Sequence, residues 1–415
     1  MLFSKPTKAA GIDIGSHSVK VVLASKAGGR LRIENVGYAL VDRNQMNVDP
    51  ISAQAEALRS ALRFIPLAQC LCVGALPGQT VVIRYPRLAE MPKDRLAEAI
   101  EAEAGQNIPY DLSEVSLDWT PLLTVNEGDK TLTKVLLVAA KHEVIESRVQ
   151  VSDLAGVQYA ILDVDSLALA DAAECCGLLG GPDQEETVAL VNLGFSGTSI
   201  HFTKNGVSNF IRDVNWGGRE IIQAVAKAQR CEFAEAERVV LDAALEAPEA
   251  DAPFEEAPEP EAAPAAAEAP QGPSLLDPLD DELGGLGDLG SPSGEPAAAE
   301  RPADTGGGGS KPGLASMIGT PLNRLVSEIR RSFDYYEQQL YEQPVSRIVL
   351  SGGTAHLPVL RETLMDELGV DEVVVADPTA DGIAFADNAS LNQLREHPAQ
   401  FMIALGLAAR GVAEL

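Results

Sequence analysis

Apolar positions near the start of the chain fall into three short runs with the length and spacing of β-strands. The runs occupy residues 10–14, 19–24 and 31–38, a turn rich in glycine and serine lies at 15–18, and a helical pattern follows over 52–64. The same order returns in the second half of the chain. Its strands are expected at 187–193, 198–203 and 207–213, its glycine turn at 194–197, and its helix at 219–229. Two copies of a β-β-β-α unit predict an α/β fold with two similar lobes that face one another.

A different pattern separates the two copies. Residues 81–85, 115–122 and 133–140 are expected to be strands, and 92–106 a helix, because Leu96, Ile100 and Ala104 recur at helical spacing. This order predicts an inserted strand-helix-strand-strand module.

A long amphipathic helix is predicted at 321–341, with an apolar stripe that would pack on a core. The stripe consists of Leu322, Leu325, Ile329 and Phe333. Residues 404–409, by contrast, form a helix face of small residues that would permit a close crossing with another element.

The composition changes abruptly at 246–310, which is rich in acidic residues, proline, alanine and glycine. Such a segment buries too little apolar surface to offset the entropy of ordering it, so we expect disorder. The expected organisation is 1–80 and 156–186 for lobe 1, 81–155 for the inserted module, 187–245 and 311–395 for lobe 2, 246–310 for the linker, and 396–415 for a C-terminal helix that returns to lobe 1.

Net charge and hydropathy narrow the possible surroundings of the chain. The formal net charge of −29 argues against nucleic acid as a partner, because phosphate backbones are bound by clustered Lys and Arg. The sequence has no run of about 20 apolar residues that could cross a bilayer and no basic amphipathic tail. The five cysteines have neither zinc-site nor disulfide spacing. We therefore expect a cytoplasmic protein that reaches a membrane only through a partner.

The first glycine turn has the composition of a phosphate-binding loop. Glycine frees backbone N–H groups for phosphate oxygens, hydroxyls add donors, and a lysine adds a positive charge. Asp13, at the end of the preceding strand, could hold Mg²⁺ through water. The candidate residues in this segment are Asp13, Gly15, Ser16, His17, Ser18 and Lys20.

Two later segments complete the candidate site. The turn of the second copy would form the other half of a phosphate clamp across an interlobe cleft, through Asn192, Gly194, Gly197 and Thr198. A strand over 348–351 then runs into Gly352, Gly353 and Thr354, where glycine would let a flat base approach the backbone.

Taken together, these motifs resemble the actin-like ATPases, and within that superfamily the PilM family of type IV pilus assembly proteins more closely than the FtsA family. The segments that carry the resemblance are GIDIGSHSVKVV from Gly11, EAEAGQNIP at 101–109, VDSLAL at 164–169, NWGGRE at 215–220 and EIRRSFDYY at 328–336. The resemblance covers almost the whole chain outside the linker.

The resemblance implies an actin-like, duplicated ribonuclease H-like fold that binds ATP and Mg²⁺ between its lobes, with Gly217 and Gly218 also at the nucleotide. It implies that the short N-terminal cytoplasmic peptide of a bitopic inner-membrane protein similar to PilN docks in a groove beside the module at 81–155. Pilus motor ATPases or platform proteins are further partners that it suggests.

The chain departs from the family pattern at two positions. Asn192 stands where the second turn usually has Asp, and an amide cannot act as a general base. Val240 stands where a lysine is common. We therefore expect slow or absent hydrolysis, with Asp163 and Asp165 as the remaining carboxylates that could orient a water or cap a helix.

Two other functions remain open from the sequence. One is an FtsA-like cell-division adaptor, which the missing amphipathic C-terminus disfavours. The other is a small-molecule kinase of the same fold, for which the sequence offers no clear acceptor-activating carboxylate. Whether the host assembles pili or a related secretion machine is also left open.

Overall fold

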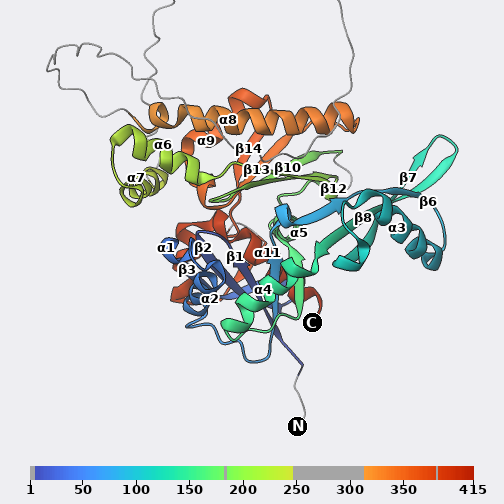
Figure 1. The fold of residues 1–415 in the computed structure, drawn as a ribbon, viewed down its shortest axis with the longest axis horizontal. Helices are drawn as coiled ribbons and strands as arrows, with labels where there is room; N and C mark the ends of the chain where they lie inside the picture. Colours follow the sequence, from blue (N-terminus) through green and yellow to red (C-terminus); the bar gives the residue numbers. More distant parts are fainter. Residues whose placement is uncertain (1–4, 182–184, 246–312, 380–381) are drawn as a thin grey trace, which may run out of the picture. The chain divides into compact units, whose positions relative to one another are not determined.

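The computed structural model describes residues 5–181, 185–245, 313–379 and 382–415 (Figure 1). The linker predicted to be disordered, 246–310, lies outside the described residues. Two β-sheets form the centres of two lobes, and a third sheet belongs to the inserted module.

The sheet of lobe 1 has six strands, of which three form an antiparallel meander and two extend it in parallel from β1. A two-residue strand closes the edge beside β3. In spatial order the strands are β15 (Ala384–Phe385), β3 (Arg30–Leu40), β2 (Ser18–Ala27), β1 (Lys8–Ile14), β4 (Cys70–Leu76) and β9 (Ile161–Val164).

The sheet of lobe 2 repeats this layout with five strands. Its meander is followed by two parallel strands on the same side, as in lobe 1. In spatial order the strands are β12 (Val207–Val214), β11 (Thr198–Lys204), β10 (Thr187–Leu193), β13 (Arg347–Ser351) and β14 (Glu372–Val375). The register also repeats, since Asp13 pairs with Lys20 in lobe 1 and Asn192 pairs with Ser199 in lobe 2.

Helices cover the outer face of each sheet and bury its apolar side chains. In lobe 1 these are α1 (Arg43–Met46), α2 (Pro50–Ala61) and α4 (His142–Leu154). In lobe 2 they are α6 (Gly218–Gln229), α7 (Phe233–Leu245), α8 (Leu314–Asp334) and α9 (Pro358–Leu368). A short helix, α10 (Asn392–Glu396), precedes the C-terminal helix.

The long helix α8 begins at Leu314, so the start predicted at Pro321 is wrong. Proline ends a helix when its missing N–H is needed, but here the carbonyl of Pro321 accepts a hydrogen bond of 2.9 Å from the Trp216 indole, and the ring is buried in the lobe 2 core. Tertiary packing thus outweighs the local preference. The predicted stripe, Leu322, Leu325, Ile329 and Phe333, is buried throughout.

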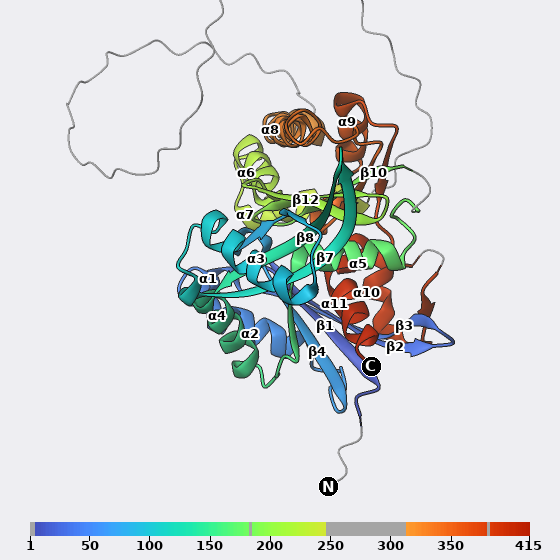
Figure 2. The same ribbon diagram turned by 90° about the vertical axis from the view of Figure 1, so that its right-hand side faces the viewer.

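Two helices lie between the two sheets, α5 (Asp165–Cys175) and α11 (Met402–Ala413) (Figures 1 and 2). Their side chains share one core with strands of both lobes. Glycine makes the crossing possible: a Cβ on Gly406 would lie 1.7 Å from the Ala168 carbonyl oxygen, and one on Gly11 would lie 2.0 Å from that of Ala404. The small-residue face of the C-terminal helix therefore packs backbone against backbone.

The inserted module has four strands rather than the three expected, because the chain pairs once more between the first strand and the helix. Its elements are β5 (Val81–Arg84), β6 (Arg87–Ala89), α3 (Lys93–Asn107), β7 (Val115–Glu127) and β8 (Lys130–Lys141). The side chains of Leu96, Ile100 and Ala104 are buried against the sheet, as their spacing predicts.

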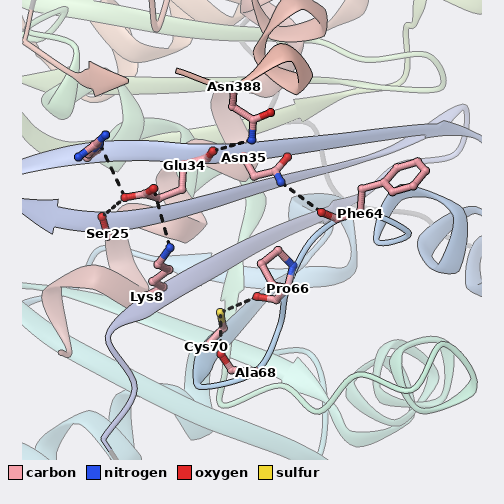
Figure 3. A network of polar contacts seen from close by, with 10 residues as sticks. Lys8, Ser25, Glu34, Asn35, Phe64, Pro66, Ala68, Cys70 and Asn388 are labelled. Carbon is pink, nitrogen blue, oxygen red and sulfur yellow. Dashed lines mark hydrogen bonds and ion pairs between the residues drawn. The ribbon is translucent and has the colours of Figure 1, made fainter. Parts of the chain in front are cut away.

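Polar contacts fasten the edge of lobe 1 away from the cleft (Figure 3). The Glu34 carboxylate accepts a hydrogen bond of 2.7 Å from Ser25 and forms an ion pair of 3.8 Å with Lys8. The Asn388 amide donates to the Glu34 carbonyl at 3.1 Å, which fixes the chain after β15 to β3.

The contact at Gly406 yields a stability prediction. Gly406→Ala places a methyl group inside the backbone of α5, so the two helices must separate and the free energy of unfolding should fall by about 3 kcal/mol or more. Urea denaturation measures the change. The matched control is Gly319→Ala in α8, where a Cβ meets no atom within 4 Å. This substitution should raise the free energy of unfolding by about 0.5–1 kcal/mol. Equal midpoints for Gly406→Ala and the unsubstituted protein would contradict the backbone contact.

Candidate functional site

A cavity of about 800 Å³ lies between the lobes, and both glycine turns line it. From the sequence-predicted residues it brings together Asp13, Gly15, Ser16, His17, Ser18, Lys20, Asp165, Asn192, Gly194, Gly197, Thr198, Gly218, Gly352, Gly353 and Thr354. Asp163 and Gly217 are not part of its lining. Segments that are far apart in the chain thus converge on one cleft.

The two turns have the same backbone geometry. The Gly15 N–H donates to the Ser18 carbonyl at 3.1 Å, and the Gly194 N–H donates to the Gly197 carbonyl at 3.0 Å. A Cβ on Gly194 would lie 2.8 Å from the Gly197 oxygen, so a larger residue would force this turn apart. The turns also touch across the cleft, because the hydroxyls of Ser16 and Ser196 are 2.5 Å apart.

Asp13 and Lys20 are cross-strand neighbours at the end of the first hairpin, and both line the cavity. Their side chains form an ion pair of 3.2 Å. Within the described residues no three His, Cys, Asp or Glu side chains are arranged to hold a metal directly. The Asp13 carboxylate beside the first glycine turn suits Mg²⁺ held through water, because this ion keeps much of its water and shares phosphate oxygens.

The third segment is fixed against the second turn by Gly352. This residue has φ +92°, and a Cβ there would lie 2.4 Å from the Leu193 carbonyl oxygen. A Cβ on Gly353, in contrast, would approach only the Gln400 amide oxygen, at 4.0 Å. Gly353 therefore offers open backbone to the cavity, as expected for contact with a flat ring.

Gly217 has a packing role instead of the predicted place in the cleft. It precedes α6, and a Cβ there would lie 2.3 Å from the Phe195 carbonyl oxygen, behind the second turn. Its neighbour Gly218 does line the cavity, beside the Thr354 hydroxyl. Gly217 thus supports the turn from outside.

Asp163 and Asp165 are separated by the change from strand β9 to helix α5. Asp163 accepts a hydrogen bond of 2.7 Å from the Val164 N–H and does not line the cleft, whereas Asp165 does. Asp165 Oδ1 accepts from the Gly78 N–H at 2.9 Å and from the Ser166 N–H at 2.6 Å. Of the two candidates for orienting a water, only Asp165 therefore lies at the cleft.

Sequence reasoning missed the partner of Asp165. The Asp213 carboxylate approaches it over Gly78, since a Cβ on Gly78 would lie 3.1 Å from oxygens of both aspartates. Burial, with Asp213 as a second cause, raises the pKa of Asp165 to about 7. Desolvation by the cleft walls raises the pKa of Asp213 too. Asp213 could have been found from the sequence by its position at the end of the third strand of the second repeat.

A second set of contacts joins the lobes beside the first turn, and we call it the interlobe bridge: His17, Arg43, Phe195, Phe233 and Glu237. The Glu237 carboxylate is 2.8 Å from His17 Nε2 and accepts from Arg43 at 3.0 Å. The Arg43 guanidinium lies 4.0 Å from the Phe233 ring centroid, and the His17 ring packs on Phe195. Burial lowers the pKa of His17, which keeps the ring neutral at neutral pH.

The inserted module contacts lobe 2 through a buried polar chain. The Tyr85 hydroxyl is 2.7 Å from the Ser208 hydroxyl, which is 2.8 Å from His201 Nε2. His201 Nδ1 is 2.9 Å from the Ser166 carbonyl, next to Asp165. Burial lowers the pKa of His201 to about 4, so the chain consists of neutral groups.

Helix α7 supplies the apolar side of the cavity, with Val240 and Leu241. Val240 lines the cleft at the position where the resemblance would place a lysine. Among the further residues missed from the sequence are Gln79, Arg148, Glu237, Glu396 and Gln400, which belong to no short motif.

The raised pKa of Asp165 predicts that Asp165→Asn increases the free energy of unfolding more at high pH than at low pH. The folded protein holds a proton on Asp165 up to about pH 7 while the unfolded chain loses it near pH 4, so stability from this group falls as the pH rises between these values. The amide oxygen can keep the bonds from Gly78 and Ser166. Because the side chain is partly exposed to the cleft, we expect the variant to gain on the order of 1–3 kcal/mol at pH 8 relative to pH 5.

Urea unfolding at both pH values measures this difference. The control is Asp49→Asn at the exposed start of α2, where the hydrogen bonds from Ser52 lower the pKa of the carboxyl and no gain at pH 8 is expected. An Asp165→Asn variant whose relative stability is the same at both pH values would contradict the raised pKa.

Comparison with known proteins places this cleft in context. Residues 11–249 and 315–412 match the family described as type IV pilus assembly protein PilM. Among solved structures, a chain of a PilM–PilN type IV pilus biogenesis complex is 21% identical and superposes with a TM-score of 0.67, over 97% of this chain and 98% of that one. Ethanolamine utilization protein EutJ from Carboxydothermus hydrogenoformans is 14% identical, with a TM-score of 0.49 over 98% and 91% of the two chains.

The superposition on the PilM–PilN structure confirms the predicted α/β actin-like fold. No helix in the described part of the chain is long and apolar enough to cross a membrane. The family match extends over most of the sequence on both sides of the linker. The chain therefore belongs to the PilM family of type IV pilus assembly proteins.

Proposed function

We propose that the protein is a cytoplasmic ATP-binding scaffold of a type IV pilus or related secretion machine, held at the inner membrane by the N-terminal peptide of a bitopic partner similar to PilN. The observation that carries the nucleotide part is the pair of equivalent glycine turns, 15–18 and 194–197, that face each other across one cavity. Family membership and the likeness to a chain from a PilM–PilN complex support the partner.

The cavity supports a nucleotide with its phosphates between the turns. Its volume of about 800 Å³ falls in the range of small-molecule sites, and the backbone N–H groups of the two turns can donate to phosphate oxygens. The base lies on the open backbone of Gly353, beside Val240 and Leu241. Bound Mg²⁺ would be held by Asp13 through water and would neutralise phosphate charge.

The chemistry of the lining supports slow hydrolysis or none. Asn192 stands in the place where an acidic side chain could act as a base, and its amide cannot accept a proton. Burial holds a proton on Asp165 up to about pH 7, where its pKa lies, and its Oδ1 accepts from two backbone N–H groups. Only Oδ2 of a partly protonated carboxyl is then left to act on a water. A protein that binds ATP without consuming it quickly fits a scaffold whose bound nucleotide sets the interlobe angle.

The inserted module offers a surface for the peptide. In its sheet, β7 pairs only with β8 among the described strands, so the other side of β7 carries free backbone groups. An extended peptide can add to such an edge through main-chain hydrogen bonds and use neighbouring pockets for side chains. Pilus motor ATPases or platform proteins are further partners consistent with the family.

Isothermal titration with ATP and Mg²⁺ tests the nucleotide site. We expect binding, and a roughly tenfold loss of affinity in Lys20→Gln, because a charged hydrogen bond to phosphate is worth about 1.5 kcal/mol. The matched control is Lys8→Gln at the start of β1, the end of that strand away from the first glycine turn. The Lys8 ammonium pairs with Glu34 outside the cavity lining, so its loss should leave affinity unchanged.

The same sample is expected to release phosphate slowly, and Asn192→Asp to speed the release by restoring a carboxylate. If the protein does not bind ATP, the proposed function is contradicted. Rapid release that Asn192→Asp does not increase would contradict the scaffold view and favour an enzyme.

Affinity capture from a membrane extract tests the partner. We expect the immobilised protein to retain a bitopic membrane protein, and an excess of a synthetic peptide with that protein's N-terminal cytoplasmic sequence to displace it. A scrambled peptide of the same composition is the control. Retention that the N-terminal peptide leaves unchanged, or no bitopic protein among those retained, would contradict the proposal.

A further inference from the structure

Arg148 occupies an unusual place in the cleft. It projects from α4, the helix that follows the inserted module, lines the cavity and is only 8% exposed. Its one hydrogen bond among the described residues joins Nη1 to the carbonyl oxygen of Ile14 at 3.3 Å. Ile14 ends β1 directly before the first glycine turn, so the guanidinium lies beneath the loop proposed to hold phosphate.

The carboxylates that act electrostatically on Arg148 already have hydrogen-bond or ion-pair partners of their own. Asp13 forms its ion pair with Lys20 at 3.2 Å, and Asp165 Oδ1 accepts from two backbone N–H groups. Both influence Arg148 electrostatically, yet no described carboxylate lies within ion-pair distance of it. The pKa of the Arg148 guanidinium is lowered, mainly by burial, because no carboxylate lies close enough to offset the loss of water.

A buried guanidinium without a counter-ion is costly, because it remains charged and has five N–H donors of which a single long bond uses one. Proteins retain such a group where a ligand supplies the anion. The planar fork of arginine matches two oxygens of a phosphate or a carboxylate group. Phosphate is the anion favoured here, because the two glycine turns that line the same cavity can donate backbone N–H groups to phosphate oxygens.

We propose that Arg148 binds the terminal phosphate of a nucleoside triphosphate and so makes the site select the triphosphate over the diphosphate. The inference rests on the proposed nucleotide site. A nucleotide with its base on Gly353 extends its phosphates toward the first turn, and Arg148 reaches that turn from the lobe 1 side at Ile14. The last phosphate of the row therefore meets the guanidinium, while a diphosphate ends short of it.

Titration of ATP and ADP, each with Mg²⁺, into the full chain and its variants tests this assignment. We expect the unsubstituted protein to bind ATP more tightly than ADP, and Arg148→Met to lower ATP affinity 10- to 100-fold while ADP affinity changes less than threefold. Arg148→Lys keeps the charge but loses the fork, so its ATP to ADP ratio should be intermediate.

Arg59→Met is the matched control, because Arg59 also donates to a backbone carbonyl of α4, that of Leu154 at 3.2 Å, but is exposed and lies outside the cavity lining. Both affinities should stay unchanged in this variant. Thermal melting of each variant shows whether it is folded. If Arg148→Met fails to fold, Arg148→Lys alone decides through its ATP to ADP ratio.

The outcomes separate the two proposals. Equal losses of ATP and ADP affinity in folded Arg148 variants, no loss in either, or equal binding of both nucleotides by the unsubstituted protein would overturn the role of Arg148 and leave the nucleotide site intact. Failure of the unsubstituted protein to bind either nucleotide would overturn both.

Discussion

The close crossing of α5 and α11 is the constraint on which the geometry of the cleft depends. Gly406 lies against the Ala168 carbonyl, and Gly11 of β1 lies against that of Ala404, so the strand and the two helices meet backbone to backbone at these glycines. Both helices share their core with the sheets of the two lobes. Because backbone contacts of this kind leave little freedom for adjustment, they fix the distance at which the glycine turns at 15–18 and 194–197 face one another.

Much of the fold was predictable because it follows from local sequence patterns, most of which occur twice in the chain. The strand runs, the glycine turns and the apolar spacing at Leu96, Ile100 and Ala104 each depend on neighbours in sequence. The start of α8 was not predictable, since the burial of Pro321 beside Trp216 is a tertiary effect that overrides the preference of proline.

The site divides in the same way. Residues in the glycine turns could be found from composition, whereas Asp213, Arg148 and Glu237 stand alone on a strand and two helices and enter the cavity only through long-range packing. Asp163 shows why closeness in the chain is not enough: it is two residues from Asp165, but the change from strand to helix after Val164 gives the two side chains different surroundings.

Charge in the cleft is distributed unevenly. The lobe 1 side combines Asp13 with Lys20 and leaves Arg148 without a carboxylate, while Asp165 and Asp213 share the space over Gly78 and resist losing both protons. Arg148 on one side, and Asp165 with Asp213 on the other, are therefore left without a partner of opposite charge among the described residues. An anionic ligand that arrives with a hydrated cation supplies the missing charges on both sides.

The interlobe bridge and the neighbouring serine contact restrict the opening of the cleft. Ser16 touches Ser196, and His17 and Arg43 hold Glu237, so the lobes cannot swing apart until these contacts break together. Widening of the cleft at this rim would separate the two serine hydroxyls and leave the Glu237 carboxylate without its partners, so the polar groups of the rim are satisfied in the closed arrangement.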